Sequence, residues 1–286
     1  MRHVADACIA GLMLVTPLEV QTSPAVKFTL HIDLVQSNDT PANDWSRFVG
    51  QLASQAVPPG GADQTVTVGP KATRMEQHQA LFGTPAGIVT LFREDGEFGF
   101  DPSARTFWKE PARLSSQELA TMASIKPSIT FDKTGKFESI NGKRAERVTT
   151  TMTMPMPADV AAAPIPGLPP NLIVTIDAWV TDELKMPAGG RMPVIDQKIL
   201  AALGVSQVEQ FTDNRFLLKA TMRINFITGV EMVMTVRDVT DVNVPASTFD
   251  VPAGFKEVPP PSGRLRAEGA SASLAEALAE AGRGGR

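Results

Sequence analysis

The stretch from Phe216 to Val239 constrains the fold more than any other part of the chain. Apolar and polar residues alternate through its first half, and the alternation resumes after Thr228-Gly229. A period of two is typical of strands with one buried face, so the stretch predicts a long hairpin that turns at Thr228-Gly229. An isolated hairpin is marginal in water, so the rest of the chain must supply further strands. The apolar positions are Leu218, Ala220, Met222, Ile224, Phe226, Val230, Met232, Met234 and Val236.

Strand signals recur along the chain and predict a mainly β protein. They lie at Val26–Gln36, Thr65–Gln79, Ile88–Arg93, Glu97–Asp101, Arg105–Lys109, Ile129–Ile140, Lys143–Met154 and Leu172–Thr181, and Val244–Phe249 is predicted to be an edge segment. Thr65–Gln79 is either two strands or one bent strand, broken near Gly69-Pro70.

Asn141-Gly142 separates two of these strands and is typical of a two-residue hairpin loop. A two-residue loop would place Lys136 opposite Arg147, whereas a three-residue loop would place Glu138 opposite Glu146. Both registers put like charges together, so the pairing of this hairpin stays open.

Helical spacing occurs only in three short segments. Asp44 precedes apolar residues that run from Trp45 to Leu52, Ser115 and Glu118 form a capping box, and apolar residues follow Pro193 at helical spacing up to Gly204. We expect three short helices that lie against the sheet.

Composition and motifs exclude several classes of function. The 286 residues are 43% hydrophobic, enough for a substantial core, and the net charge of −4 without a basic stripe argues against a nucleic-acid partner. His3, His31 and His78 are predicted to be exposed and have neither cysteine nor spaced carboxylates around them. We therefore predict no catalytic residue, no metal site, no cofactor and no enzymatic activity. No apolar run reaches the about 18 residues that a transmembrane helix needs.

The two ends of the chain differ from its middle. Arg2 and His3 precede an apolar run from Cys8 to Val15, and small residues follow, which predicts a signal peptide over residues 1–25 and a periplasmic or secreted protein. Asp6 and the lack of an Ala-x-Ala site leave a cytoplasmic protein as the alternative. The predicted domain is 26–258, with a proline-rich insert at 155–170, and 259–286 is predicted to be a disordered tail with one short helix.

The order of strands and the closing segment Phe249-Asp250-Val251-Pro252-Ala253-Gly254-Phe255 resemble the bacterial lipoprotein-carrier-like superfamily, the outer-membrane lipoprotein-sorting-like proteins, and in particular its uncharacterised members. Gly135–Val148, with Ile140-Asn141-Gly142-Lys143 at its turn, is similar to a strand pair of such proteins. The resemblance covers most of Val26–Val258. It implies an exported α+β protein in which a single curved antiparallel sheet forms an incomplete β-barrel, with short helices packed on one face. The concave face holds acyl chains in some relatives, and the family supplies no catalytic residues.

Methionines on the apolar strand faces are the candidate ligand-binding residues. A flexible thioether suits an apolar ligand of no fixed shape, but it also suits an ordinary core. Trp179 lies on the opposite face of its strand and either guards an opening or contacts a helix. The candidate residues are Met152, Met154, Trp179, Met222, Phe226, Met232 and Met234. The predicted function is a carrier or sensor of a lipid or an acylated ligand. The alternative is an envelope module with a fully packed core that binds another envelope protein and no lipid.

Overall fold

The computed structural model describes residues 22–36, 50, 56–110, 127–155, 169–190, 215–225 and 227–261, and these residues form one twelve-stranded sheet. In chain order its elements are β1 (Thr22–Gln36), β2 (Ala62–Val68), β3 (Ala72–Gln77), β4 (Val89–Arg93), β5 (Gly96–Asp101), β6 (Thr106–Lys109), β7 (Ser128–Ile140), β8 (Lys143–Pro155), β9 (Asn171–Lys185), β10 (Arg215–Ile224), β11 (Ile227–Pro245), the 3-10 helix η1 (Ala246–Phe249) and β12 (Lys256–Glu257).

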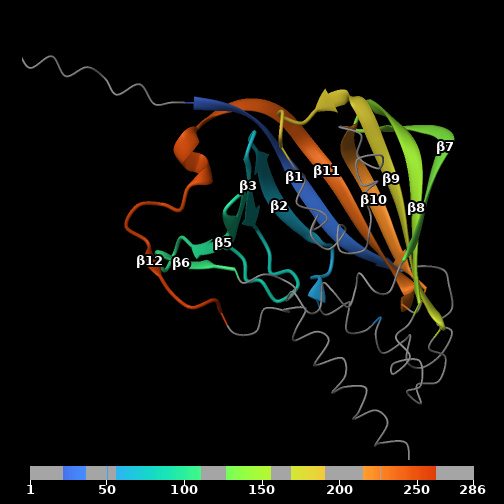
Figure 1. The fold of residues 1–286 in the computed structure, drawn as a ribbon, viewed down its shortest axis with the longest axis horizontal. Coiled ribbons are helices and arrows are strands. Elements are labelled where there is room, and N and C mark those ends of the chain that lie inside the picture. The colour runs from blue at the N-terminus through green and yellow to red at the C-terminus, as the bar shows by residue number, and fades with distance from the viewer. Residues whose placement is uncertain are drawn as a thin grey trace, which may run out of the picture.

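The sheet is bent and open (Figure 1). Its order is β12-β6-β5-β4-β3-β2-β1-β11-β10-β9-β8-β7, so the outermost strands β12 and β7 are not paired with each other. This arrangement confirms the mainly β class and the single unclosed sheet. The predicted helices are not confirmed, because 44–49, 51–52, 115–123 and 193–204 lie outside the described residues. Within the described part of the chain, η1 is the only helical element whose bounds are defined.

One strand pair departs from the antiparallel prediction. Every other neighbouring pair is antiparallel, but β12 runs parallel to β6 at the edge of the sheet. The chain reaches that edge because it leaves β11, in the middle of the sheet, and crosses through η1. Phe255 then packs edge-on against Phe100 of β5, with ring centroids 5.8 Å apart. The prediction of an edge segment at Val244–Phe249 is therefore wrong, because Val244 pairs with Ser23 of the central strand β1.

The long hairpin exists, but its turn lies closer to β10 than the sequence predicts. Ile224 pairs with Ile227, so the chain turns directly after Ile224, and Asn225 lies in the turn. The Asn225 side chain accepts a hydrogen bond from the Ile173 amide at 3.0 Å and donates one to the Asn171 carbonyl at 2.9 Å, which fixes the turn beside β9. Gly229 instead takes a φ of 85° inside β11, where the pairing with β10 is interrupted.

The Asn141-Gly142 loop has two residues, since Ile140 pairs with Lys143. Neither predicted pair of like charges forms, however. The register shifts between Lys133 and Phe137, and Gly135 adopts a φ of 64° there. Because of this irregularity, Lys136 and Arg147 are not paired in the register of the hairpin. Positive φ suits glycine, and a bulge at that point removes the unfavourable contact.

The main core lies between β1 and its neighbours. Val26, Phe28, Leu30 and Ile32 of β1 are buried, as the alternation predicts, and pack with residues of β2, β10 and β11. Phe28 meets Phe216 edge-on, with 5.6 Å between ring centroids. A second cluster consists of Val148, Ala178 and Val180, on β8 and β9.

Candidate functional site: two faces of the β8–β11 sheet

The register of β8, β9, β10 and β11 sorts their side chains onto two faces, because directly paired residues point to the same side. Val148, Ala178, Ala220 and Met234 form one row across these strands. The adjacent row is Thr149, Asp177, Thr221 and Val233, which points to the opposite face.

On the face that carries Val148 and Ala178, the side chains change from buried to half-buried along the strands. Val148, Ala178 and Ala220 are each 2% exposed or less. The rows that follow toward the turn at Asn225 are half-buried, apart from the buried Thr150 and Val174. We call the apolar part of those rows the methionine face. It consists of Leu34, Met152, Met154, Leu172, Val174, Ile176, Met222, Ile224 and Met232.

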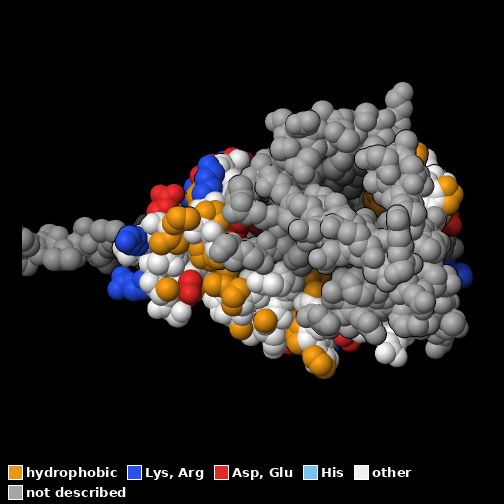
Figure 2. Space-filling view, turned by 90° about the horizontal axis from the view of Figure 1, so that it is seen from below, with side chains coloured by type: hydrophobic (Ala, Val, Ile, Leu, Met, Phe, Trp, Pro, Cys, Tyr) orange, Lys and Arg blue, Asp and Glu red, His pale blue; other side chains and the backbone are white. Residues whose placement is uncertain are grey.

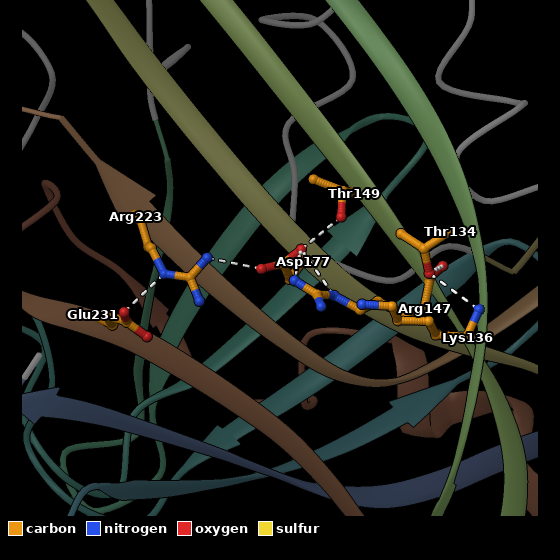
Figure 3. A network of polar contacts seen from close by, with 7 residues as sticks. All are labelled: Thr134, Lys136, Arg147, Thr149, Asp177, Arg223 and Glu231. Carbon is orange, nitrogen blue, oxygen red and sulfur yellow. Dashed lines mark hydrogen bonds and ion pairs between the residues drawn. The ribbon is translucent and has the colours of Figure 1, made fainter.

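The opposite face carries a polar network around Asp177, whose side chain is only 1% exposed (Figure 3). Thr149 Oγ1 donates to Asp177 Oδ1 at 2.6 Å, and Arg147 Nη2 lies 2.8 Å from the same oxygen. Arg223 Nη1 donates to Asp177 Oδ2 at 2.7 Å, while its Nε donates to Glu231 Oε1, also at 2.7 Å. One carboxylate therefore connects β8, β9 and β10, and Arg223 extends the connection to β11.

The electrostatics of the network favour charged forms. Burial acts to raise the pKa of Asp177, but hydrogen bonds from Thr149, Arg223 and Arg147 and the charge of Arg147 outweigh it, so the pKa lies below its ordinary value. Hydrogen bonds to Glu231 and Asp177 raise the pKa of Arg223. Two carboxylates and two guanidinium groups balance in charge. A carboxylate held ionised by so many donors is a poor general acid or base at neutral pH, so the network is a structural connection.

Trp179 lies on the same face as Asp177, two residues further along β9. Its ring is 7% exposed and pairs with Arg147 and Lys219. The Lys219 Nζ is 4.8 Å from the ring centroid and the Arg147 guanidinium carbon is 5.6 Å away, which are cation–π distances. Within the described part of the chain, Trp179 Nε1 has no hydrogen-bond partner. By strand register Trp179 therefore lies on the face of the polar network and not on the methionine face, and it is also a member of the main core cluster.

The remaining candidates divide between the methionine face and its surroundings. Met152, Met154, Met222 and Met232 lie on it, with Met222 directly opposite Met232. Met234 is the half-buried member of the neighbouring row, opposite the buried Ala220. Phe226 lies outside the described residues.

The sequence reasoning missed the Asp177 network altogether and placed its residues on a solvated face. It also predicted an exposed His31, whereas the His31 side chain is 16% exposed and its Nδ1 lies 2.7 Å from Asp63 Oδ1. His78 is exposed as predicted, and His3 lies outside the described residues.

An open groove of about 390 Å³ lies at the far ends of the strands. Pro24 and Asp241 come from β1 and β11, Pro70 from the turn after β2, and Met186 and Pro187 from the segment after β9. None of the described candidate residues lines it. Among the described residues no group of three or more His, Cys, Asp or Glu side chains is placed to hold a metal ion, and no helix there is long and apolar enough to cross a membrane.

No protein-family model matches the sequence, and no curated protein matches it. Solved structures with a similar arrangement include an uncharacterized conserved protein from Thermus thermophilus, which is 8% identical, with 83% of this chain and 91% of that chain covered, at a TM-score of 0.38. The Mycobacterium tuberculosis lipoprotein LppX is 13% identical, with 74% of this chain and 85% of that chain covered, at a TM-score of 0.30. A LolA superfamily protein from Nitrosomonas europaea is 7% identical, with 79% of this chain and 89% of that chain covered, at a TM-score of 0.27.

Proposed function

We propose that the protein is a carrier or sensor that holds the acyl chain of a lipid on the methionine face. The observation that carries this proposal is the change in burial along one face of the sheet. Ala178 and Ala220 are sealed, whereas Ile176, Met222 and Met232 in the next row are half-buried and apolar. Flexible methionines at a partly open apolar surface can repack around a ligand of variable shape.

The methionine face has a suitable length for an acyl chain. Its central row runs from Thr150 on β8 through Ile176, Met222 and Met232 to Leu34 on β1. At about 4.8 Å between neighbouring strands, the four spacings add to about 19 Å. One leaflet of a bilayer is about 15 Å of hydrocarbon, so a typical acyl chain can lie along this row.

One polar group in this row favours a ligand with a polar group, such as a lipid, over a ligand that is only hydrocarbon. The Thr150 side chain is buried, and its Oγ1 has no hydrogen-bond partner among the described residues. Buried hydroxyls are usually hydrogen-bonded, and an unpaired one calls for an explanation. The carbonyl of a lipid ester or a fatty-acid carboxylate would accept a hydrogen bond from it.

Native mass spectrometry of the full protein tests the carrier function. We expect a bound species at the mass of a lipid that disappears after organic extraction, and a fatty-acid analogue should then bind to the extracted protein. A packed interaction module would show the mass of the protein alone and no uptake of the analogue. That result would contradict the carrier function and favour the alternative.

Export is the second part of the proposal. The leader was predicted to end at residue 25, yet β1 begins at Thr22, and Thr22 to Ala25 pair with Pro245 to Val242. Cleavage after Ala25 would remove four paired residues. We therefore expect the leader to be cleaved on the N-terminal side of Thr22, so that Thr22 stays in the mature protein. N-terminal sequencing of protein from an envelope fraction checks this, and an intact Met1 on protein found only in the cytoplasm would contradict export.

A further inference from the structure

The loop between β3 and β4 has a strained turn at its tip. Leu81 and Thr84 exchange two backbone hydrogen bonds, with N···O distances of 3.0 and 2.9 Å, so Phe82 and Gly83 form a two-residue turn. Both turn residues have positive φ, 47° and 75°, as in a type I′ turn. Asn, Asp and Gly prefer these positions, and an aromatic residue with positive φ is unusual.

Packing does not explain Phe82. The neighbouring Leu81 is 3% exposed and anchors the loop, and the Phe82 amide donates to the Ala56 carbonyl at 2.8 Å. The Phe82 side chain, however, is 38% exposed. A strained residue whose large apolar side chain is more than a third exposed points to a function for that side chain.

The loop also lacks charge. No Asp, Glu, Lys or Arg occurs between Glu76 and Arg93, although 20% of the chain is charged. Ala80, Pro85 and Ala86 are exposed or half-exposed around the tip. The loop leaves the sheet at the same end of the strands as the turn between β10 and β11 and the end of β8. Figure 2 views the molecule from below and shows patches of hydrophobic side chains on its described surface, with charged side chains toward the left end.

We propose that the Phe82 tip docks the protein on the surface of a lipid bilayer. Aromatic side chains favour the interface between headgroups and hydrocarbon. A protein partner fits less well, because a specific interface buries about 800 Å² on each side and one short uncharged loop offers neither that area nor charge complementarity. A single aromatic anchor gives weak, reversible association. This docking goes beyond the proposed carrier function and can be tested separately from it.

A fluorophore at the tip tests the contact. In the full protein with Cys8→Ser, an environment-sensitive dye on Ala86→Cys, an exposed position of the same loop that leaves Phe82 in place, should brighten and shift to the blue when phosphatidylcholine vesicles are added. The same dye at Ala104→Cys, in the exposed β5–β6 turn between Asp101 and Arg105, should change little. No response at position 86, or an equal response at both positions, would overturn the proposal and leave a protein partner as the interpretation of this loop.

Phe82→Asn separates docking from folding. The variant creates Asn-Gly, the pair that a type I′ turn prefers, so the melting temperature should rise by about 2–4 °C. Co-sedimentation with phosphatidylcholine vesicles should weaken about tenfold, because the apolar side chain is gone. A lower melting temperature or unchanged co-sedimentation would overturn the proposal. Lipid seen by native mass spectrometry should be the same in this variant, so failure of docking and failure of the carrier function give different results.

Discussion

Asp177→Asn should destabilise the folded protein by about 3 kcal/mol, because it removes a buried charge that pairs with two arginines. The amide keeps the size of the side chain but cannot balance Arg147 and Arg223. Arg223 retains Glu231 and is 42% exposed, which places the loss at the low end of the range for broken buried pairs. Urea unfolding followed by circular dichroism measures the difference.

Asp95→Asn is the matched control. Asp95 makes an ion pair with Arg93 at 2.9 Å, but its side chain is 56% exposed in a turn, so the same chemical change should cost less than about 1 kcal/mol. Equal losses for the two variants would show that the Asp177 network does not hold the strands together.

The pH dependence follows from the lowered pKa of Asp177. Because the pKa is lower in the folded state than its ordinary value of 3.8, the ionised carboxylate stabilises the fold above that value, and the stabilisation is lost as the pH falls through the folded pKa. The difference in stability between the wild type and Asp177→Asn should therefore be constant near neutral pH and should narrow below about pH 4. If the difference in stability between the wild type and Asp177→Asn stays the same below about pH 4, this account of Asp177 is contradicted.

The network also gives the methionine face a rigid support. Thr149 and Asp177 lie on the reverse side of the strands that carry Met152 and Ile176. Hydrogen bonds across the strands fix their spacing without using any side chain of the apolar face. The methionines can therefore change rotamer while the backbone beneath them stays in place, which is what a pre-formed site for a variable ligand requires.

Period-two alternation was enough to predict most strands, because burial on one face determines which residues can occupy it. The bulges were not predictable in the same way. Gly135 and Gly229 looked like ordinary turn or strand residues, and only the pairing of neighbouring strands shows where an extra residue is accommodated. The parallel β12 depends on a chain crossing that leaves no periodic signal.

The Asp177 network could have been suspected from one residue. Asp is disfavoured in strands, and Asp177 lies between Ile176 and Ala178 in the middle of one. Its partners could not be identified, because Arg147 and Arg223 come from segments whose adjacency depends on the order β11-β10-β9-β8. The sequence reasoning did find the methionines, since their face follows from alternation alone.

Met232→Glu should abolish binding of a fatty-acid analogue while the protein stays folded. Met232 is half-buried and pairs with Met222 and Leu34 in the central row of the methionine face, so a carboxylate there can reach water. An acyl chain laid along that row would have to cover the charge, which is strongly unfavourable. Thermal melting and probe fluorescence should be measured together on the wild type and the variant.

Thr235→Glu is the control on the same strand. Thr235 points to the opposite face and pairs with Lys219, so the new carboxylate meets a lysine and probe binding should be retained. If Met232 is instead sealed in the core, Met232→Glu buries an unpaired carboxylate at a cost of several kcal/mol, comparable to the stability of a whole domain. Collapse of the melt together with no probe binding by the wild type would end the carrier hypothesis, because the half-exposed row would then be ordinary core and the protein an interaction module.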